Sequence, residues 1–507
     1  MGALDDYREV WLYHATKRVR NNPPIAETDM THTITLPIWI FIALVLLSVL
    51  VALEWLLLPG VRWYFRRKVR GVIDEISVRL NIDIPQFKLT RRQALIDRLM
   101  SDPRVLSAVE DYADKEKTSR RVAMQMVYRY AHEIVPAFNA YVYFRVGYWL
   151  SKNFARFVYR VRLGYTDAQA LAAINPKSTV VFVMNHRSNM DYILVSFLAA
   201  EKVALSYAVG EWARIWPLQG LIRAMGAYFV RRNSGDALYR MVLQRYVQMA
   251  TEGGVPQAMY PEGGLTTDGL LRPPKLGLLD YMLKNFDAAG ERDLVFIPVG
   301  INYDRVVEDR SLLSRRDAAL ARPGVWHTLR ITLAYLGRHL WLRLRGNGYR
   351  YGYACVNFGQ PISMREQVRR MGIDFRALDD AGRRPLVAQI GADLMREIGQ
   401  VVPVLPVPLV ATVLLREPNK ALSELELKVA VNALIQGIES QGGHVYVPRG
   451  DRDYALNVGL RMLTLRHMVD EQAGLFRANP AELAVLSYYA NSIAHLCPGA
   501  PVTPNVG

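Results

Sequence analysis

A short apolar run, a polar turn and a second apolar run follow one another between Ser178 and Ala200. The first run, residues 180–184, is typical of a buried β-strand, and the second, residues 192–200, is typical of a buried helix. A chain that passes from a buried strand through a polar turn into a buried helix favours an α/β fold, in which such turns usually carry the reactive groups. This stretch therefore constrains both the fold class and the place where chemistry is expected.

The polar turn between these runs holds His186 and Asp191, with four residues between them. If the helix begins near Ser188, Asp191 falls in its first turn, where the carboxylate can face back towards the imidazole. A carboxylate bonded to one ring nitrogen fixes the tautomer and stabilises the charged ring, so the other nitrogen can take a proton from a hydroxyl. A simpler interpretation also fits, because Ser188 and Asp191 match the S-x-x-D signature of a helix cap.

Composition narrows the class of protein and its partners. The 507 residues carry a formal net charge of +16, which implies an anionic partner such as a phosphate-bearing ligand or a lipid surface. We predict no nucleic-acid partner, because no nucleic-acid-binding motif is present. Only Cys355 and Cys497 occur, so no disulfide framework is expected and the bulk of the chain suits a reducing cytosol. The nine His show no metal-binding spacing, so we predict no metal site.

Residues 34–58 form an apolar run of 25 residues, which is long enough to cross a bilayer. Trp39 and Trp55 lie near its ends, as interfacial aromatic residues do. Basic residues follow it at once: Arg62, Arg66, Arg67, Lys68 and Arg70. This charge bias predicts a membrane anchor with the long C-terminal part in the cytoplasm. Glu54 and Pro37 keep open two alternatives, a buried core helix and a helix lying in the interface.

Two segments of different character follow the apolar run. Residues 70–135 are rich in charge and have the pattern of amphipathic helices. Residues 138–165 then interleave aromatic side chains with basic ones. A helix of that composition is typical of a membrane-surface segment, and an ordinary helix with its aromatic stripe in the core fits equally well.

From about residue 176 to residue 362, short apolar runs alternate with helical stretches, which is the pattern of an α/β domain. Strands are predicted at residues 180–184, 204–209, 227–230, 257–260, 295–301, 331–336 and 351–358. Helices are predicted at residues 190–200, 216–225, 237–251 and 276–286. After Ser363 the chain is expected to be helical, with a break at Pro403, Pro406 and Pro408 and one hairpin at residues 442–450.

Three later strands also end in residues suited to binding. Residues 226–232 read G-A-Y-F-V-R-R, and the arginine pair suits a bidentate grip on a phosphate. Residues 260–264 read Y-P-E-G-G, whose glycines let a ligand approach the backbone closely. Residues 296–304 contain Pro298 in an apolar run that ends in a loop. Taken singly, the three segments also fit an exposed arginine pair, a tight turn and a core strand.

Together and in this order, the four segments resemble the four sequence blocks of the glycerolipid acyltransferase superfamily. The blocks are H-x-x-x-x-D, G-x-x-F-[IV]-R-R, [FY]-x-E-G-G and an apolar-Pro-Val run. The phrase V-N-F-G-Q-P-I at residues 356–362 is similar to the strand that follows these blocks. The chain length, the basic helical N-terminal part and the ending Y-Y-A-N-S-I-A-H-L at residues 488–496 are similar to bacterial membrane glycerol-3-phosphate acyltransferases.

The resemblance implies an α/β fold in which a mixed β-sheet acyltransferase domain is flanked by helices. We expect four regions: an N-terminal tail and transmembrane anchor at 1–60, a basic amphipathic helical region at 61–165, the α/β acyltransferase domain at 166–365 and a C-terminal mostly helical domain at 366–507. The expected location is the cell inner membrane, with the catalytic domain facing the cytoplasm.

The implied activity is that of a glycerol-3-phosphate 1-O-acyltransferase, which moves a fatty acyl group from acyl-CoA or acyl carrier protein to the sn-1 hydroxyl of glycerol 3-phosphate. No cofactor beyond the acyl thioester is implied. His186 is the implied general base, and Asp191 orients and stabilises it. Substrate-binding roles fall on five residues: Arg231 and Arg232 at the acceptor phosphate, Glu262 and Gly263 shaping the acceptor site, and Lys275 as a second phosphate contact.

One departure from the family pattern keeps the acceptor open. Glycerol-3-phosphate acyltransferases commonly carry Arg after E-G-G, and this chain has Leu265, so Arg272 or Lys275 would have to supply the charge. Lysophosphatidate or a lysophospholipid is therefore an alternative acceptor. A thioesterase would leave the arginine pair unexplained, and a non-catalytic membrane-surface protein would have no need of both His186 and Asp191.

Overall fold

The computed structural model describes residues 85–199, 203–210, 218–231, 234–314 and 351–497, together with the single residue Ser48. Apart from Ser48, these residues lie in one compact unit, Lys68–Gly507. Within the described residues, no helix is long and apolar enough to cross a membrane. Apart from Ser48, the expected anchor at 34–58 lies outside the described residues, as do the expected strand at 331–336 and Arg232.

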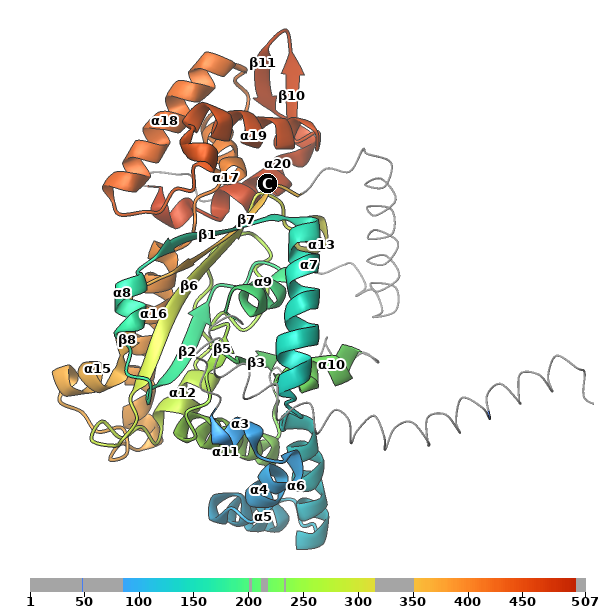
Figure 1. Cartoon of the computed structure of the whole chain (residues 1–507), viewed down its shortest axis with the longest axis vertical. Coiled ribbons are helices and arrows are strands. Elements are labelled where there is room, and N and C mark those ends of the chain that lie inside the picture. The colour runs from blue at the N-terminus through green and yellow to red at the C-terminus, as the bar shows by residue number, and fades with distance from the viewer. Residues whose placement is uncertain are drawn as a thin grey trace, which may run out of the picture. The chain divides into compact units, whose positions relative to one another are not determined.

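A mixed eight-stranded sheet forms the centre of the unit (Figure 1). Its strands are β1 (Arg160–Thr166), β2 (Thr179–Met184), β3 (Ser206–Val209), β4 (Tyr228–Phe229), β5 (Gln257–Met259), β6 (Leu294–Tyr303), β7 (Tyr353–Phe358) and β8 (Ile362–Ser363). The order is β1-β7-β6-β2-β5-β3-β4, with β8 also paired to β6. Most neighbours are parallel, and the β6–β7 and β6–β8 pairs are antiparallel. The expected mixed α/β sheet is therefore confirmed.

Strand β2 is buried on both faces, as its continuous apolar sequence predicts. Phe182 and Met184 point to one hydrophobic core, whereas Val181 and Val183 point to a second core on the opposite face. Because side chains alternate along a strand, both faces must be covered by helices. The turn that leaves this strand therefore starts from a position fixed on both sides.

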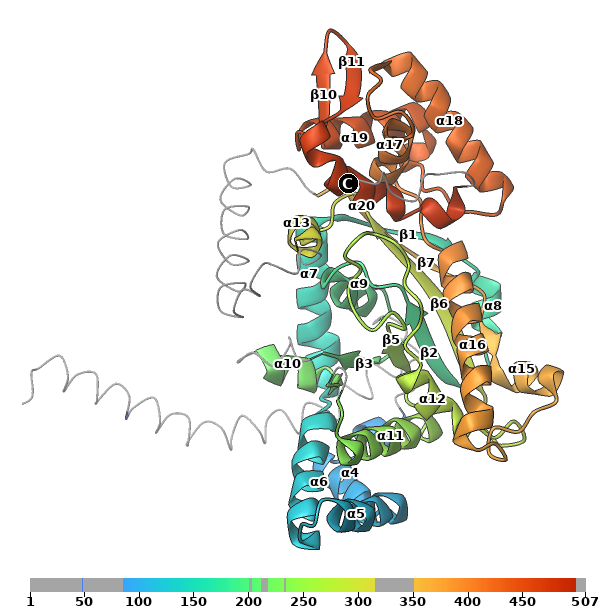
Figure 2. The same ribbon diagram turned by 180° about the vertical axis from the view of Figure 1, so that it is seen from behind.

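Helices cover the two faces of the sheet (Figures 1 and 2). The described helices up to the end of the sheet region are α3 (Gln86–Leu89), α4 (Arg92–Met100), α5 (Pro103–Lys115), α6 (Arg120–Ile134), the π-helix η1 (Val142–Gly147), α7 (Tyr148–Val158), α8 (Ala168–Ala172), α9 (Met190–Ala199), α10 (Leu218–Ala224), α11 (Ala237–Glu252), α12 (Gly277–Leu283), α13 (Asp309–Leu313), α15 (Met364–Met371) and α16 (Asp380–Gln400). Buried residues of α7 and α9 belong to the first core, and those of α6, α11, α12 and α16 belong to the second. Figure 2 shows α16 running along the sheet beside β6.

The C-terminal region adds four more helices and a small sheet. Its elements are α17 (Pro406–Arg416), β9 (Leu422–Ser423), α18 (Glu424–Ser440), the short 3-10 helix η3 (Pro448–Gly450), α19 (Arg452–Thr464), β10 (Val469–Gln472), β11 (Leu475–Ala478), the 3-10 helix η4 (Pro480–Glu482), α20 (Leu483–Asn491) and the 3-10 helix η5 (Ala494–Leu496). Pro406 occupies the first turn of α17, where its missing N–H leaves no helical bond unmade. The expected break between helices at the proline-rich stretch is thus confirmed.

Two expectations about secondary structure are wrong. The aromatic and basic segment 138–165 is not helical throughout, because its end forms β1, which pairs in parallel with β7. The alternating sequence R-V-R-L-G-Y-T suits a strand, and the pairing with β7 overrides the helical pattern before it. The expected hairpin at 442–450 is absent from that segment, which holds one isolated bridge, Val404 to Val445. The hairpin is β10–β11, whose turn residues Ala473 and Gly474 both have positive φ.

The other expected strands and helices of the α/β region that fall in the described residues are present, with small shifts at their ends. The helix expected at 216–225 is described only as α10, Leu218–Ala224. Periodicity thus placed the elements well wherever the apolar runs were short and clearly bounded.

Candidate active site

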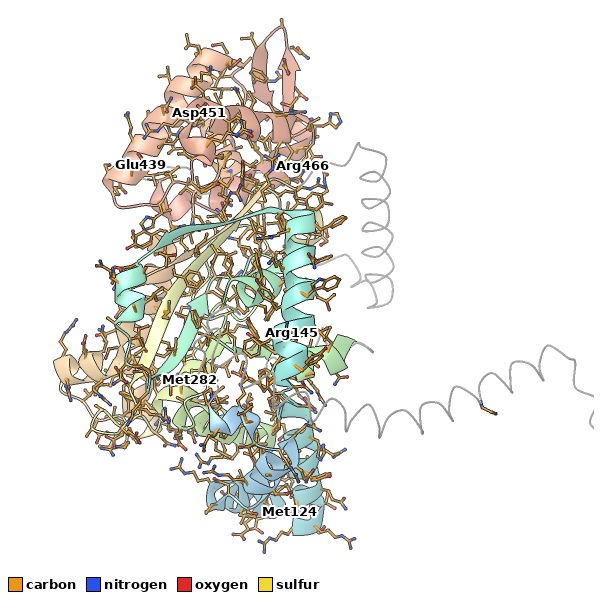
Figure 3. All side chains as sticks on the ribbon, in the orientation of Figure 1. Met124, Arg145, Met282, Glu439, Asp451 and Arg466 are labelled. Atoms are coloured by element: carbon orange, nitrogen blue, oxygen red, sulfur yellow. The ribbon has the colours of Figure 1, made fainter. Side chains whose placement is uncertain are left out.

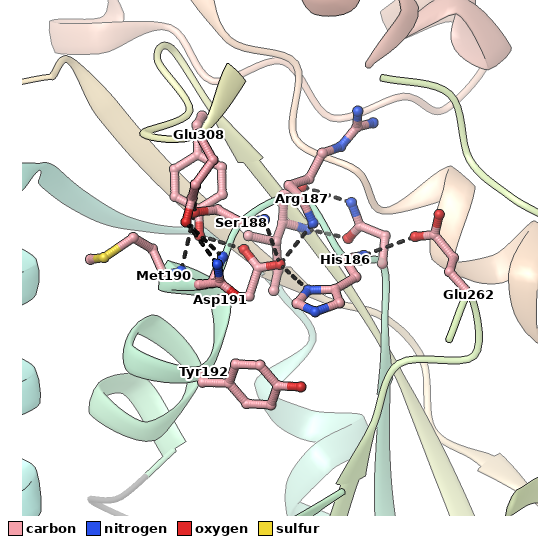
Figure 4. A network of polar contacts seen from close by, with 12 residues as sticks. His186, Arg187, Ser188, Met190, Asp191, Tyr192, Glu262 and Glu308 are labelled. Atoms are coloured by element: carbon pink, nitrogen blue, oxygen red, sulfur yellow. Dashed lines mark hydrogen bonds and ion pairs between the residues drawn. The ribbon is translucent and has the colours of Figure 1, made fainter. Parts of the chain in front are cut away.

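The turn between β2 and α9 brings His186 and Asp191 together, as the sequence predicts. Helix α9 begins at Met190, so Asp191 lies in its first turn. The imidazole Nδ1 of His186 lies 2.8 Å from Oδ2 of Asp191, and both side chains are buried. Figure 4 shows the pair from close by, with the carboxylate facing the imidazole. This contact makes Nδ1 the protonated nitrogen and leaves Nε2 as the basic one.

Asp191 holds the backbone of the turn as well as the imidazole. Its Oδ2 accepts from the amides of Arg187 at 2.8 Å and Ser188 at 3.1 Å, and its Oδ1 accepts from the Tyr303 hydroxyl at 2.5 Å. Asp191 thus makes a contact of the kind that each interpretation needs, one to the Ser188 amide and one to the imidazole. A carboxylate with this many donors cannot rotate, so the imidazole has one preferred orientation.

Two aromatic rings pack against the His186 imidazole. The Tyr260 ring stacks on the imidazole, with ring centroids 4.0 Å apart and an angle of 26° between the planes. The Tyr192 ring meets the imidazole edge to face at 5.5 Å. Nε2 of His186 is buried and hydrogen-bonds to no group among the residues that the structure describes. It is therefore the atom of this ring that a substrate hydroxyl would meet.

Glu262 connects the E-G-G turn to the turn that carries His186. Its Oε1 accepts from the His186 amide at 2.8 Å, and its Oε2 accepts from the Arg272 amide at 3.1 Å. At the carbonyl of the same residue, the Thr266 amide donates to the His186 oxygen at 3.1 Å. Burial raises the pKa of Glu262 to about 7, while the His186 amide and the Arg187 charge act to lower it. Glu262 therefore fixes the backbone of His186, and its expected role in shaping the acceptor site stays a prediction.

Glu308, which the sequence analysis did not single out, holds the far side of the turn (Figure 4). It precedes α13, and its carboxylate accepts from the Ser188 hydroxyl at 2.7 Å and from the Asn189 amide and side chain at 3.3 and 3.1 Å. Burial raises the pKa of Glu308. Together, Glu262, Asp191 and Glu308 accept from every backbone amide from His186 to Asn189.

Arg231 has a protein partner in this structure. Its Nε and Nη2 donate to both carboxylate oxygens of Glu133 at 2.8 and 2.6 Å, and its guanidinium lies over the rings of Tyr130 and Tyr239. The ion pair with Glu133 raises the pKa of Arg231. The Arg231 side chain is 33% exposed, so it lies at the surface end of β4. A phosphate at this position would share the guanidinium with Glu133.

The E-G-G turn has its own geometry around Gly263. This glycine has a φ of +67°, and a Cβ at this position would come within 2.5 Å of the Lys275 side chain. Lys275 is exposed and forms no ion pair with the residues described. The Arg272 side chain donates to the Thr267 hydroxyl at 2.6 Å. Leu265 packs half-buried against the hydrophobic core, so the position where the family commonly has Arg contributes no charge here.

The arrangement suits general-base chemistry on a hydroxyl. An oriented imidazole with a buried carboxylate partner can take a proton at Nε2, and Asp191 stabilises the resulting cation. Within the described ranges, no group of three or more His, Cys, Asp or Glu side chains is placed to hold a metal ion. The side chains around His186 that could bind a metal are one imidazole and three carboxylates. These carboxylates already accept hydrogen bonds from amide and hydroxyl groups.

The sequence analysis missed Glu308, Tyr303 and the stacking role of Tyr260. Tyr303 and Glu308 come from the end of β6 and the loop after it, more than a hundred residues beyond the turn that they hold. The signal available was the polar sequence N-Y-D at the end of the fourth block, which sits at the same end of the sheet as His186 because β2 and β6 are parallel. Tyr260 was already visible as the aromatic position of the [FY]-x-E-G-G block.

The chain is similar to known acyltransferases. A family model described as Acyltransferase matches residues 166–302, and one described as Glycerol-3-phosphate acyltransferase C-terminal region matches residues 342–498. The chain is 27% identical over 429 residues to a glycerol-3-phosphate acyltransferase of Pseudomonas entomophila (strain L48), which covers 80% of this chain and 49% of that protein. It is 25% identical over 444 residues to one from Xylella fastidiosa (strain M23), which covers 85% of this chain and 50% of that protein.

These matches confirm the resemblance that the four sequence blocks indicated. The chain spans about half the length of the curated relatives that it matches. A solved structure, the 1-acyl-sn-glycerophosphate (LPA) acyltransferase PlsC from Thermotoga maritima, aligns with 61% of this chain and 97% of that chain at 13% identity and a TM-score of 0.29.

Proposed function

We propose that this chain, which belongs to the glycerolipid acyltransferase superfamily, transfers a fatty acyl group from an acyl thioester to the sn-1 hydroxyl of glycerol 3-phosphate. The observation that carries the proposal is the buried His186–Asp191 pair, whose Nε2 has no partner among the described residues. The matches to glycerol-3-phosphate acyltransferases over most of the chain support the choice of acceptor.

The reaction balances without a covalent enzyme intermediate. The hydroxyl oxygen attacks the thioester carbonyl carbon while His186 Nε2 takes the hydroxyl proton, and Asp191 stabilises the imidazolium. Collapse of the tetrahedral intermediate breaks the carbon–sulfur bond, and the proton on His186 passes to the thiolate. The thioester supplies the driving force, so we propose that no cofactor takes part. The acyl donor is acyl-CoA or the acyl thioester of acyl carrier protein.

The acceptor phosphate needs cations near the hydroxyl. We propose that Arg231 and Arg232 hold it and that Lys275 makes a second contact, with Gly263 giving Lys275 room to lie over the turn. Arg231 and Lys275, the two of these cations that the structure describes, support the proposal unequally. Arg231 is engaged by Glu133, whereas Lys275 has no ion-pair partner among the described residues. Leu265 leaves one cation fewer than the family commonly has, so lysophosphatidate is the acceptor to test beside glycerol 3-phosphate.

We further propose that the chain works at the cytoplasmic face of the inner membrane, anchored through residues 34–58. A helix face on η1 and α7 supports this location, because Trp149, Leu150 and Val146 are 62%, 40% and 37% exposed there. Basic side chains flank the face at Arg156 and at Arg145, which Figure 3 labels. Exposed apolar and aromatic side chains flanked by arginines fit the boundary between acyl chains and anionic headgroups.

Flotation with anionic vesicles should weaken in Trp149→Ser, and unchanged flotation would contradict a role for this face.

The decisive experiment compares acceptors and donors directly. Membranes containing the protein are given a long-chain acyl-CoA or acyl carrier protein with glycerol 3-phosphate or lysophosphatidate. His186→Ala serves as the inactive variant. His444→Ala serves as the matched histidine control, because the His444 ring stacks on Tyr165 and not on a residue of the turn. Turnover of glycerol 3-phosphate that is lost only in His186→Ala is expected. Turnover of lysophosphatidate alone would overturn the acceptor while leaving the chemistry in place.

A further inference from the structure

The residue beside the catalytic histidine is a buried arginine that binds no carboxylate side chain among the described residues. Arg187 is 1% exposed, and its guanidinium donates through Nη1 to the Gly269 carbonyl and through Nη2 to the Ser492 carbonyl at 2.9 Å. Burying a cation is costly unless its donors are satisfied, and here backbone carbonyls of two distant segments satisfy them. A side chain of this kind fixes the distance between the segments that it bridges.

The two segments also contact each other. Asn491 Nδ2 donates to the Asp268 carbonyl at 2.8 Å, and a Cβ on Gly269, whose φ is +87°, would lie 2.0 Å from the Tyr488 carbonyl oxygen. The Tyr488 hydroxyl reaches back to the Arg187 carbonyl at 3.4 Å. The end of α20 therefore packs against the loop at 268–269 without space for a side chain between them.

This contact continues into the catalytic turn. The Arg187 amide donates to Asp191 Oδ2, the same oxygen that holds the imidazole. The loop that carries Gly269 also contains Thr266, whose amide donates to the His186 carbonyl. A shift of the C-terminal segment would thus act on both the carbonyl and the amide of the peptide that joins His186 to Arg187.

We propose that Arg187 is a positioning residue through which the C-terminal segment 488–492 fixes the catalytic turn for acyl transfer. The kinetic test of this inference rests on the proposed function. The inference assigns the C-terminal region a role in turnover. An error of about 1 Å in the place of a catalytic group costs roughly 10²-fold in rate. We call the contact of Arg187 with residues 488–492 the clamp, and it supplies this accuracy from outside the α/β sheet.

Arg187→Met keeps a side chain of similar length and removes both donor groups. We expect kcat to fall roughly 10²-fold, with the KM values for acceptor and acyl donor within about threefold of wild type, because alignment is lost and substrate contacts are not. Arg187→Lys keeps the charge but cannot reproduce the planar fork to two carbonyls, so a loss of roughly tenfold is expected. An unchanged kcat in Arg187→Met, or a rise in both KM values at constant kcat, would overturn the proposal.

A matched control separates positioning from general stability. Arg383 is 3% exposed, and it bridges Asp280 on α12 and Asp380 on α16 at 2.7 and 2.6 Å, far from the turn in the sequence and outside its network. Arg383→Met should lower the temperature of unfolding as much as Arg187→Met and leave kcat within about twofold. An equal kcat loss in both variants at equal loss of stability would show that Arg187 is merely structural.

Hydrogen exchange gives a second readout that does not depend on activity. The amides of residues 186–189 are all bonded to carboxylates, so they should exchange slowly in the wild type. Faster exchange at these amides is expected in Arg187→Met and also in Asn491→Ala, which alters only the C-terminal side of the contact. Unchanged exchange in both variants would overturn the clamp. A wild type that transfers no acyl group to any acceptor would refute the proposed function, and the exchange result would still decide the clamp.

Discussion

The turn that carries His186 leaves β2 at the centre of the sheet, whereas Arg231 follows β4 at the sheet edge. At the centre, three carboxylates hold successive amides, those of the buried Asp191 and Glu262 and of the partly buried Glu308, and the imidazole is fixed on one side by Asp191 and on one face by Tyr260. At the edge, Arg231 is one-third exposed and is held by a single carboxylate, that of Glu133. The imidazole is therefore held by several contacts, whereas Arg231, which is expected to bind the acceptor, is held by one ion pair.

The difference has a physical reason. Proton transfer needs angles and distances set within fractions of an ångström, which only a network of short bonds from several segments supplies. Recognition of a mobile phosphate needs charge that can rearrange as the ligand enters and leaves. Substitutions at the centre should therefore lower kcat, and those at the edge should change the KM of the acceptor.

The largest effect is expected for Asp191→Asn. The amide retains the shape but offers one acceptor oxygen in place of two, so it cannot satisfy the four donors of His186, Arg187, Ser188 and Tyr303 together. By analogy with a triad aspartate, kcat should fall by about 10⁴-fold. Steady-state kinetics on a variant whose circular dichroism matches the wild type measures this. A loss below about tenfold would mean that the imidazole is oriented without Asp191.

Glu262→Gln tests the second carboxylate through pH. The ionised carboxylate accepts from both the His186 and the Arg272 amides, so wild-type kcat/KM should decline as pH falls below about 7, the pKa to which burial raises Glu262. Stability should move in the opposite direction. Because the folded pKa is raised, the contribution of this group is complete below its unfolded value and is lost as pH rises through about 7.

Two measurements test this pair of trends. Urea unfolding at about pH 5 and about pH 8 should show that Glu262→Gln is more destabilising, relative to wild type, at the lower pH. The acidic limb of kcat/KM should also lose one ionisation in the variant. Identical pH profiles of wild type and variant, in both activity and stability, would contradict a raised pKa at Glu262.

The centre of the site was largely predictable from sequence, and its supports were not. The strand, turn and helix around His186 are local, because apolar runs of clear length bound a polar turn. Glu308 and Tyr303 reach the turn from the end of β6, and such contacts depend on strand order, which one sequence does not reveal. Strand β1 was mistaken for part of a helix because only its pairing with β7 distinguishes it from the helical residues before it.

At the edge of the site, the sequence motif was recognisable but the ion-pair partner of Arg231 was not. The motif correctly placed Arg231 at a strand end, but a sequence motif says nothing about which carboxylate lies beside it. Glu133 comes from α6, in a region where charges are numerous and no spacing marks this one. Leu265 was visible as a departure from the family pattern, and its packing against the core follows from its apolar side chain.

Glu308→Gln should have an intermediate effect. Gln keeps one acceptor for the Ser188 hydroxyl or the Asn189 groups, so the turn loosens at its far end while the His186–Asp191 contact remains. We expect kcat to fall roughly tenfold, in line with one weakened charged hydrogen bond. Glu439→Gln, an exposed change beside Arg452, is the control, and Figure 3 labels Glu439. A kcat equal to that of the control variant would remove Glu308 from the group of residues that support the turn.

The smallest effects are expected at the edge, and they have opposite signs. Glu133→Gln weakens the competitor for the Arg231 guanidinium, so the KM for the acceptor should fall by a few-fold, as expected for a partly exposed ion pair. Arg231→Met removes the proposed phosphate contact and should raise the acceptor KM several-fold, with the KM of the acyl donor unchanged in both variants. Initial rates over a matrix of both substrate concentrations separate the two KM values. If Arg231→Met raised both KM values equally and Glu133→Gln changed neither, the pair would be a structural link between α6 and β4, and the acceptor phosphate would have to be bound elsewhere.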